Sequence, residues 1–333
     1  DGVVYSPHGI MYGQCGDDRG AGRDHIEEPL RGFARAECRF PLAAGRSPVM
    51  MTPREILKQY DIQPTKRLGQ SFLIDVNVVH KIAAAACTAP GDVVVEIGAG
   101  IGVLTASLAQ RASRLIAVEL DTRLVKILQD RFGTNPVVQI HAGDVLKFDF
   151  SLISDKYNSK VKVIGNVPYN ISSPVIFHLM KHRTVINNFT LMLQKEVVER
   201  LVAVPGTKSY GVPSVLLQIY VDVERLFDVA PSCFYPRPKV VSSVMQGFFR
   251  KQPLFELEDE ELFVKLVRSA FARRRKMLLN NLKNASFLES LPEQLIKEAL
   301  IQTGIDPTRR GETLSPEDFA NLANNLKYRL TNN

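Results

Sequence analysis

An asparagine, a proline and a tyrosine stand close together in the hexapeptide GNVPYN (165–170), which follows the apolar run 161–164. These residue types suit the binding of a flat base with an exocyclic amino group. The side-chain oxygen of Asn166 can accept a hydrogen bond from the amine, and the ring of Tyr169 can stack on the base. Pro168 fixes the local backbone, so that a neighbouring carbonyl can act as a second acceptor. For the tetrapeptide alone, a strand-to-loop turn with a surface tyrosine remains the alternative interpretation.

A glycine-rich turn, EIGAGIG (96–102), lies between an apolar run and a segment with helical spacing. Gly98 and Gly100 permit tight backbone turning and the close approach of a ligand. Glu119 ends the next apolar run, where an acidic side chain can accept hydrogen bonds from both hydroxyls of a ribose. Asp144, in AGDVL, is placed where it can accept a hydrogen bond from an adenine amino group. The pattern therefore predicts a cofactor that contains adenosine.

The glycine spacing narrows the choice of cofactor. It is GxGxG and not the GxGxxG of dinucleotide-binding enzymes, whose third glycine is dispensable when no pyrophosphate is bound. The acidic residues Glu96, Glu119 and Asp144 also favour a cationic ligand without phosphates. S-adenosylmethionine, an adenosine with a sulfonium and an amino-acid tail, fits both observations and is the predicted cofactor. Glu96 either contacts this ligand or supports the turn from the end of its strand.

A methyl donor beside an amine-holding motif predicts methyl transfer to an adenine. The exocyclic amine of adenine is a poor nucleophile because its lone pair is delocalised into the ring. Acceptors at Asn166 and at the carbonyl of Val167 or Pro168 would favour a tetrahedral nitrogen whose lone pair points at the methyl group. Positioning and electrostatics then carry the rate, without a general base or a metal. The four cysteines and six histidines have no metal-ligand spacing, and no metal is predicted.

The elements that position these residues follow from the alternation of short apolar runs with helical spacing. Such alternation predicts βαβ units and a parallel sheet that is covered on both faces. The two last runs predict an antiparallel edge. The predicted fold class is thus α/β, with a mostly parallel seven-stranded sheet. The predicted strands are 93–97, 115–119, 137–141, 161–165, 189–193, 215–221 and 240–249.

A change of pattern after the linker 250–257 predicts a second domain. Apolar residues recur at helical spacing from Leu262 to Phe271, and Ser315 with Pro316 is typical of a helix start. We therefore expect a methyltransferase domain at 51–250 and a small all-helical domain at 251–333.

Residues 1–50 do not share the patterns of the rest of this chain of 333 residues. They contain six arginines and no lysine, many glycines and no sustained period of 2 or 3.6. Their acidic residues argue against a mitochondrial transit peptide, and a secretory signal would need an apolar segment. The consecutive Met50 and Met51 suggest that the functional chain begins there. We expect residues 1–50 to be disordered or a non-native extension.

Positive charge gathers in one run. The formal net charge is +7, and Arg273, Arg274, Arg275 and Lys276 stand in succession in a segment that we expect to be helical. Beside a pocket that methylates a base, phosphate binding is the favoured interpretation. Two alternatives remain, a solvated helix face and side chains that pack their stems against the catalytic domain.

One further aromatic residue is a candidate for the base-binding site. Phe234, in CFYPRPKV, is a candidate second stacking partner for the target base, with core packing as the alternative. No apolar run approaches the ~20 residues that a membrane span needs. We expect a cytoplasmic protein that acts as a monomer and does not enter a membrane.

Eight segments in order resemble the KsgA-type small-subunit ribosomal RNA adenine dimethyltransferases. The resemblance spans roughly residues 51–330 and implies a Rossmann-like domain followed by a helical domain. It implies dimethylation of the N6 amines of two adjacent adenines in the 3′-terminal hairpin loop of small-subunit rRNA. The implied partners are this rRNA and the immature small subunit, with a role in its biogenesis. The segments are RLGQSFLID, EIGAGIGVLT, VELD, GDVLKFD, GNVPYNISSPVIFHL, QKEVVERL, SCFYPRPKVVSSV and FARRRKMLLNNL.

The resemblance also implies the residues that contact S-adenosylmethionine. The family usually has asparagine at the position of Ser71. A contact through the backbone would tolerate this difference, whereas a contact through the amide would leave the affinity weaker. The implied contacts are Ser71, Leu73, Gly98, Glu119, Asp144 and Asn166.

Two rival functions differ from this one in target and in class. The first is methylation of large-subunit rRNA, as in macrolide resistance, or of DNA adenines, and the segment RRGETLSPEDF counts against both. The second is a binding or assembly protein that kept the fold and lost catalysis. The intact Glu119, Asp144 and Asn166-x-Pro168-Tyr169 count against that alternative.

Overall fold

The computed structural model describes residues 51–65, 68–86 and 89–332. The expectation about residues 1–50 lies outside this part of the chain. Among the described residues, no helix is long and apolar enough to cross a membrane.

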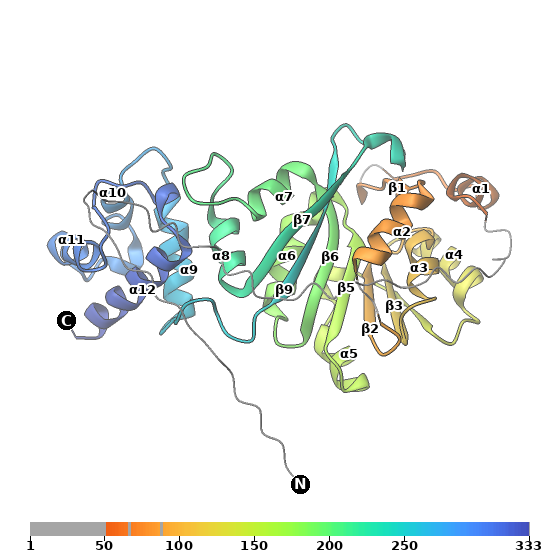
Figure 1. The fold of residues 1–333 in the computed structure, drawn as a ribbon, viewed down its shortest axis with the longest axis horizontal. Helices are drawn as coiled ribbons and strands as arrows, with labels where there is room; N and C mark the ends of the chain where they lie inside the picture. Colours follow the sequence, from red (N-terminus) through yellow and green to blue (C-terminus); the bar gives the residue numbers. More distant parts are fainter. Residues whose placement is uncertain (1–50, 66–67, 87–88, 333) are drawn as a thin grey trace, which may run out of the picture. The chain divides into compact units, whose positions relative to one another are not determined.

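A seven-stranded sheet forms the centre of the fold (Figure 1). Its order is β4-β3-β2-β5-β6-β9-β7, and the first five strands in this order run parallel, while β9 is antiparallel to both β6 and β7. The predicted α/β class and the antiparallel edge are confirmed. The strands are β2 (Val93–Ile97), β3 (Arg114–Glu119), β4 (Val138–Ala142), β5 (Val161–Asn166), β6 (Ile186–Gln194), β7 (Val221–Val229) and β9 (Ser242–Phe249).

Helices cover both faces of the parallel part because its strands are apolar on both sides. In β2, Val94 packs in a cluster with side chains of α2 and α3, whereas Val95 and Ile97 pack in the cluster that contains α5 and α6. Side chains alternate between the faces of a strand, and burying each one contributes roughly 1.5–3 kcal/mol. The helices beside the sheet are α2 (Val76–Ala85), α3 (Val103–Leu108), α4 (Thr122–Phe132), α5 (Phe150–Tyr157), α6 (Ser172–Lys181) and α7 (Lys195–Leu201).

Several of these helices begin at an aspartate. Asp75, Asp121 and Asp149 each accept hydrogen bonds from backbone N–H groups in the first turn of α2, α4 and α5. Such a cap satisfies donors that have no partner within the helix and is worth about 1 kcal/mol. The caps fix where each helix leaves its preceding strand.

The expectation of a strand at 215–221 is wrong. Residues 215–220 lie in helix α8 (Val212–Tyr220), and Val221 begins the edge strand β7. Pro213 stands in the first turn of α8, where its missing N–H costs nothing. Helix α8 is buried on almost all sides, so its apolar run has no polar face. A short buried helix of this kind cannot be told from a buried strand by its sequence pattern.

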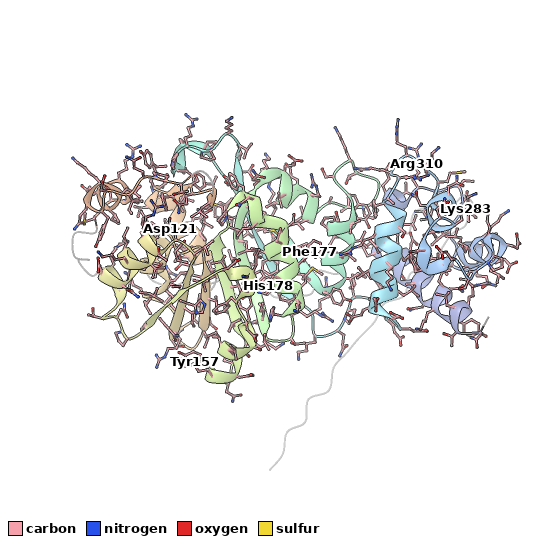
Figure 2. The ribbon with its side chains drawn as sticks, turned by 180° about the vertical axis from the view of Figure 1, so that it is seen from behind. Asp121, Tyr157, Phe177, His178, Lys283 and Arg310 are labelled. Carbon is pink, nitrogen blue, oxygen red and sulfur yellow. The ribbon has the colours of Figure 1, made fainter. Side chains whose placement is uncertain are left out.

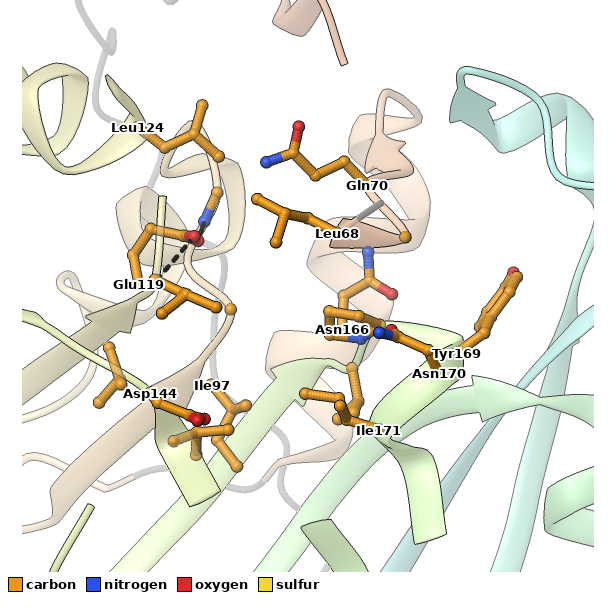
Figure 3. Close-up of a pocket in the computed structure, with 18 of the residues that line it drawn as sticks. Leu68, Gln70, Ile97, Glu119, Leu124, Asp144, Asn166, Tyr169, Asn170 and Ile171 are labelled. Atoms are coloured by element: carbon orange, nitrogen blue, oxygen red, sulfur yellow. Dashed lines mark hydrogen bonds between the residues drawn. The ribbon is translucent and has the colours of Figure 1, made fainter. Parts of the chain in front are cut away.

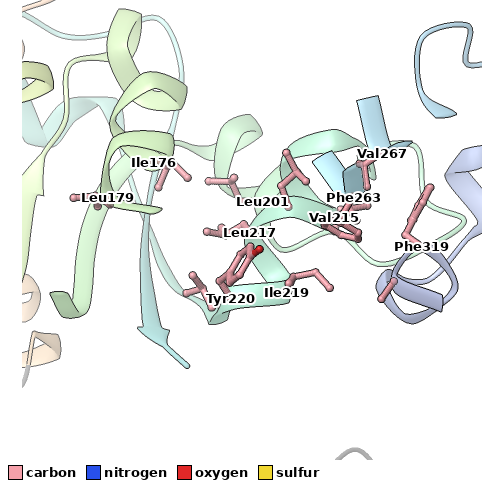
Figure 4. Packing of buried hydrophobic residues seen from close by; sticks show 14 of the residues in the cluster. Ile176, Leu179, Leu201, Val215, Leu217, Ile219, Tyr220, Phe263, Val267 and Phe319 are labelled. Carbon is pink, nitrogen blue, oxygen red and sulfur yellow. The ribbon is translucent and has the colours of Figure 1, made fainter. Parts of the chain in front are cut away.

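The C-terminal region is helical, as predicted. It consists of α9 (Glu260–Ala270), α10 (Leu278–Leu282), α11 (Glu293–Gln302) and α12 (Pro316–Thr331). Ser315 and Asp318 form a capping box at the start of α12. Figure 4 shows that Val215 and Leu217 of α8 belong to the same hydrophobic cluster as Phe263 and Phe319 of this region. The separation into domains at residue 250 stays a prediction.

A second, two-stranded ladder joins distant parts of the chain. Strand β1 (Phe72–Leu73) pairs antiparallel with β8 (Phe234–Tyr235). The ladder holds the segment that precedes α2 beside the segment that precedes β9. The helix α1 (Pro53–Gln59), with a capping box at Thr52, lies further toward the N-terminus.

Candidate cofactor and base-binding pocket

A pocket opens where β2, β3 and β5 end, the edge at which ligands bind in sheets of this kind (Figure 3). The turn after β4 and the segment 68–72 also line it. The space between its walls is about 990 Å³, which includes solvent at its open side. The structure brings together at this pocket Ser71, Gly98, Gly100, Glu119, Asp144, Asn166, Pro168 and Tyr169.

The glycine turn has a backbone that other residues rarely adopt. Gly98 and Gly100 have φ angles of +67° and +59°, in the left-handed region. A Cβ on Gly98 would also lie 3.2 Å from the backbone oxygen of Asn166. A side chain at this position would therefore strain the turn and narrow the gap between β2 and the GNVPYN segment.

Glu119 is fixed at the end of β3 by three backbone donors. Its Oε2 accepts a hydrogen bond from the N–H of Gly100 at 2.8 Å, and its Oε1 accepts from the N–H groups of Leu120 and Asp121, both at 2.9 Å. Burial raises the pKa of Glu119, and these hydrogen bonds oppose the rise. A carboxylate offers about four acceptor positions. The predicted contact with both ribose hydroxyls would therefore require one oxygen lone pair to be shared.

Glu96 does not line the pocket. Its side chain is 1% exposed, and its Oε2 accepts a hydrogen bond from the hydroxyl of Thr105 at 2.6 Å. Burial raises the pKa of Glu96 to about 8. Of the two interpretations that the sequence left open, this position favours support of the turn, because the bond joins the end of β2 to α3.

A hydrogen bond orients the amide of Asn166. Its Nδ2 donates to the backbone carbonyl of Ser71 at 3.1 Å. Because an amide nitrogen donates and a carbonyl accepts, this bond directs the nitrogen toward Ser71 and leaves Oδ1 as an available acceptor. The hydroxyl of Ser71 in turn donates to the carbonyl of Pro236 at 2.8 Å. Ser71 therefore connects the wall of the pocket to the chain after β8.

Asp144 and Tyr169 are also held by hydrogen bonds. Oδ1 of Asp144 accepts from the N–H of Leu146 at 2.9 Å and caps the short helix η2 (Val145–Lys147). The Tyr169 hydroxyl lies 2.7 Å from the hydroxyl of Ser242, at the start of β9. Burial raises the pKa of Tyr169, which remains a neutral phenol. The tyrosine ring is thus attached to the antiparallel edge of the sheet.

Two predicted site residues do not line the pocket. Leu73 and Phe234 pair with each other in the β1–β8 ladder, and both side chains lie in one hydrophobic cluster. Phe234 is 3% exposed, so the core-packing alternative describes its position in this structure. A stacking role for Phe234 stays a prediction and would require the ring to leave the cluster.

Sequence reasoning missed two polar residues of the pocket, Gln70 and Asn170. Gln70 donates from Nε2 to Oδ2 of Asp121 at 2.8 Å, and its Oε1 accepts from the N–H of Thr65. Hydrogen bonds and ion pairing with Arg123 lower the pKa of Asp121 to about 2. The only signal for Gln70 is its place beside Ser71 in GQSFL, since the contact with Asp121 spans distant parts of the sequence.

The basic run is not helical, contrary to expectation. Residues 271–276 form a turn between α9 and α10, called the basic turn below. Arg273, Arg275 and Lys276 are exposed, and their side chains form no hydrogen bond or ion pair with the described part of the chain. Arg274 does form such bonds, to Glu312 and to the backbone of Lys208. The four cations therefore do not share one environment.

Comparison with known proteins agrees with this geometry. Residues 63–327 match the family model described as ribosomal RNA adenine dimethylase. The chain belongs to this family. Among curated relatives, the ribosomal RNA small subunit methyltransferase A of Syntrophus aciditrophicus is 45% identical over 276 residues, which cover 83% of this chain and 98% of the relative. The protein of the same name in Geobacter metallireducens is 46% identical over 263 residues, which cover 79% and 95% of the two chains.

Two solved structures of methyl-transferring enzymes have the same fold. A dimethyladenosine transferase from Plasmodium falciparum is 26% identical, with a TM-score of 0.64 over 78% of this chain and 97% of that one. The 23S rRNA methyltransferase ErmE is also 26% identical, with a TM-score of 0.60 over 77% of this chain and 99% of that one. The resemblance from the motifs is confirmed, and the chain is an rRNA adenine dimethyltransferase.

Proposed function

We propose that the protein dimethylates the N6 amines of two adjacent adenines in the 3′-terminal hairpin loop of small-subunit rRNA. The observation that carries the chemistry is the oriented amide of Asn166, whose nitrogen is bonded to Ser71 and whose oxygen is available to an amine. The choice of subunit is supported by relatives named for the small subunit, which are 41–46% identical, against 26% for the large-subunit enzyme ErmE.

The walls of the pocket suit S-adenosylmethionine. Its described lining residues include the carboxylates of Glu119 and Asp144 and no lysine or arginine. Such a lining favours a cation and disfavours a phosphate-bearing cofactor such as NAD. Glu119 would hold the ribose, Asp144 the adenine amine of the cofactor, and Gly98 with Gly100 would let the ligand approach the backbone. The cofactor would supply an electrophilic methyl group.

The target adenine would be held on the opposite side of this pocket. Oδ1 of Asn166 would accept one N6 hydrogen, and a backbone carbonyl would accept the other. The sequence left Val167 and Pro168 as candidates for that carbonyl. The carbonyl of Pro168 already accepts from the N–H of Ile171 at 3.1 Å, whereas that of Val167 accepts no hydrogen bond from the described residues. We therefore assign the second acceptor to Val167.

These acceptors would act by fixing the amine and its lone pair. In the first transfer, two hydrogen bonds from N6 favour a tetrahedral nitrogen and direct its lone pair toward the methyl group, which is a contribution of positioning and preorganised electrostatics. The methylated nitrogen would release one proton to solvent after each transfer. In the second transfer its one remaining N6 hydrogen would meet a single acceptor. Tyr169 would stack on the base, with its ring held at the hydroxyl by Ser242.

The remaining proposals concern the setting of the reaction. We propose that the region 251–333 binds rRNA, with the exposed cations of the basic turn on phosphates. The substrate would be the immature small subunit in the cytoplasm, and the protein would act as a monomer.

The test is a comparison of substrates. The protein is incubated with methyl-labelled S-adenosylmethionine and with unmethylated small subunits, large subunits or duplex DNA, and primer extension maps the products. We expect label only in the small subunit, at two adjacent adenines of the 3′-terminal hairpin. Label confined to large-subunit rRNA or to DNA would overturn the proposal.

A further inference from the structure

Arg274 differs from the other cations of the basic turn because its guanidinium is bonded within the protein. Its Nε donates to the carboxylate of Glu312, and its Nη2 donates to the backbone carbonyl of Lys208 at 2.6 Å. A longer bond of 3.3 Å joins Nη2 to the carbonyl of Thr207. The planar guanidinium has donors in a fixed fork, which suits a contact with several acceptors. Arg274 thus joins the basic turn to the loop 202–211 and to the short helix η6 (Gly311–Thr313).

The loop 202–211, which connects α7 to α8, is attached to the C-terminal region at further points. The N–H of Gly206 donates to the backbone carbonyl of Glu312 at 2.8 Å. The hydroxyl of Tyr210, a fully buried residue, donates to the carbonyl of Leu314 at 2.9 Å. Glu312 therefore contacts the loop through its backbone and Arg274 through its side chain. The pair holds the middle of the loop, and Tyr210 holds its C-terminal end.

The loop 202–211 also leads back to the methyl-transfer pocket. It follows α7, and α7 begins where β6 ends. In the pairing of β5 with β6, Asn166 lies opposite Met192, and the carbonyl of Met192 accepts from the N–H of Val167 at 3.1 Å. The chain therefore runs from Met192, beside the residues that would hold the target base, through α7 to the loop that Arg274 contacts.

The cations that line a hollow beside Arg274 are of two kinds, those with partners in the protein and those without. Lys208, Arg275 and Arg310 line it together with the Arg274–Glu312 pair, and Figure 2 labels Arg310. The side chains of these three cations form no hydrogen bond or ion pair with the described residues, so they can meet phosphates. Arg274 differs from them because its Nε and Nη2 are already bonded to Glu312 and to the carbonyls of the loop, which leaves Nη1 as its one nitrogen without a partner among the described residues.

We propose that Arg274 is a positioning residue that acts with Glu312. The pair fixes the loop 202–211 against the basic turn, and so sets the position of the RNA-binding cations relative to Asn166. The inference rests on the proposed function, because it assumes an rRNA substrate that spans both parts. In this proposal Arg275, Lys208 and Arg310 bind phosphates. Arg274 instead keeps the bound RNA aligned with the pocket.

The test compares three variants that change charge differently. Arg274→Ala and the matched control Arg275→Ala each remove one positive charge, whereas Glu312→Ala removes a negative one. For each we measure kcat and KM on unmethylated small subunits and the dependence of RNA affinity on salt. We expect Arg274→Ala and Glu312→Ala to lower kcat alike, by about 10- to 10²-fold, as misplacement of a substrate does. Their slopes of log K against log salt should match that of the wild type.

The control should behave in the opposite way. Arg275→Ala should raise KM and flatten the slope by roughly 0.7–0.9, with kcat unchanged. The inference is overturned if Glu312→Ala tightens RNA binding while Arg274→Ala flattens the slope, because Arg274 would then be a phosphate contact. It is also overturned if Arg274→Ala leaves kcat unchanged.

A second measurement is independent of the substrate. Amide hydrogen exchange in residues 203–210 should become faster in Arg274→Ala and in Glu312→Ala, and should be unchanged in Arg275→Ala. Equal protection in all three variants would overturn the proposed contact. Failure of the wild-type enzyme to methylate small subunits would instead contradict the proposed function, and the exchange result would still report on the pair.

Discussion

The cofactor side of the pocket and the basic turn are built in different ways. On the cofactor side, Glu119 is buried and held by three backbone N–H groups, and the glycine turn has a fixed left-handed backbone. In the basic turn, three of four cations are exposed and have no partner among the described residues. The comparison shows a preorganised pocket beside a turn of solvated charge, and in the proposed function these would meet the cofactor and the RNA, respectively. A single substitution in the pocket should therefore lower activity or cofactor affinity strongly. A single substitution in the basic turn should weaken RNA binding only a little.

The largest effect is expected at Asn166, at the boundary between cofactor and base. Asn166→Ala should lower kcat by about 10²–10³, the usual cost of one preorganised acceptor or donor at a reacting group. The affinity for S-adenosylmethionine should stay within a few-fold of the wild type. Single-turnover kinetics and calorimetry measure the two quantities. Asn170→Ala, which changes another asparagine of the same pocket, is the matched control. Near-normal turnover by Asn166→Ala would show that Asn166 is not the acceptor for the adenine amine.

A smaller effect, on binding and not on chemistry, is expected at Glu119. Glu119→Ala should raise the dissociation constant for S-adenosylmethionine by about 10- to 100-fold, since a charge-assisted hydrogen bond is worth roughly 1.5–3 kcal/mol. The variant should also unfold at a lower temperature because three backbone donors lose their acceptor. Calorimetry beside a melting curve separates these effects. Unchanged cofactor affinity would place the ribose elsewhere.

The third prediction concerns the buried carboxyl of Glu96, which supports the glycine turn, and its effect on the pH dependence of stability. Its pKa in the folded protein is raised to about 8 by burial, above its ordinary value of 4.5. The folded state therefore binds more protons than the unfolded state between these values, and this group makes stability fall as pH rises from about 4.5 to 8. Glu96→Gln should remove that contribution and keep the bond to Thr105.

Thermal unfolding at pH 5, pH 7 and pH 8.5 measures this effect. The wild type should lose a few °C more than Glu96→Gln between the first and last condition, because about 1 kcal/mol corresponds to roughly 2–4 °C for a chain of this size range. If the unfolding temperatures of the two proteins fall equally with pH, Glu96 is not the group that makes stability depend on pH.

The smallest effect is expected in the basic turn. Lys276→Ala should flatten the slope of log K against log salt for RNA binding by roughly 0.7–0.9 and leave cofactor affinity and adenine choice alone. Lys265→Ala, in which the lost cation is exposed on α9 and paired with Glu261, is the control. A loss of cofactor affinity in Lys276→Ala would break the distinction between the two regions.

The sequence predicted the cofactor side better than the rest of the site for a physical reason. Gly98, Glu119 and Asp144 each stand at the end of a parallel strand, and such ends meet at one edge of a sheet whatever the loops do. The bond from Asn166 to Ser71 joins residues 95 apart in the chain, and no local pattern encodes it. The contact of Gln70 with Asp121 is equally nonlocal.

The errors have local causes. The segment 215–220 is helical because burial on all sides removed the polar face by which an amphipathic helix is recognised. The basic run was expected on a helix because α9 precedes it with clear helical spacing, but α9 ends at Ala270 and the chain turns before α10. The difference between Arg274 and Arg275 depends on Glu312, which is far away in the sequence.

The central claim is that this pocket dimethylates two neighbouring adenines of the small subunit. Its most direct test is mass spectrometry of RNA fragments from unmethylated small subunits after incubation with S-adenosylmethionine and either the wild type or Asn166→Ala. We expect two adjacent N6,N6-dimethyladenines in the 3′-terminal hairpin with the wild type, and almost none with the variant in the same time. Methylation at any other position, or equal products from both proteins, would contradict it.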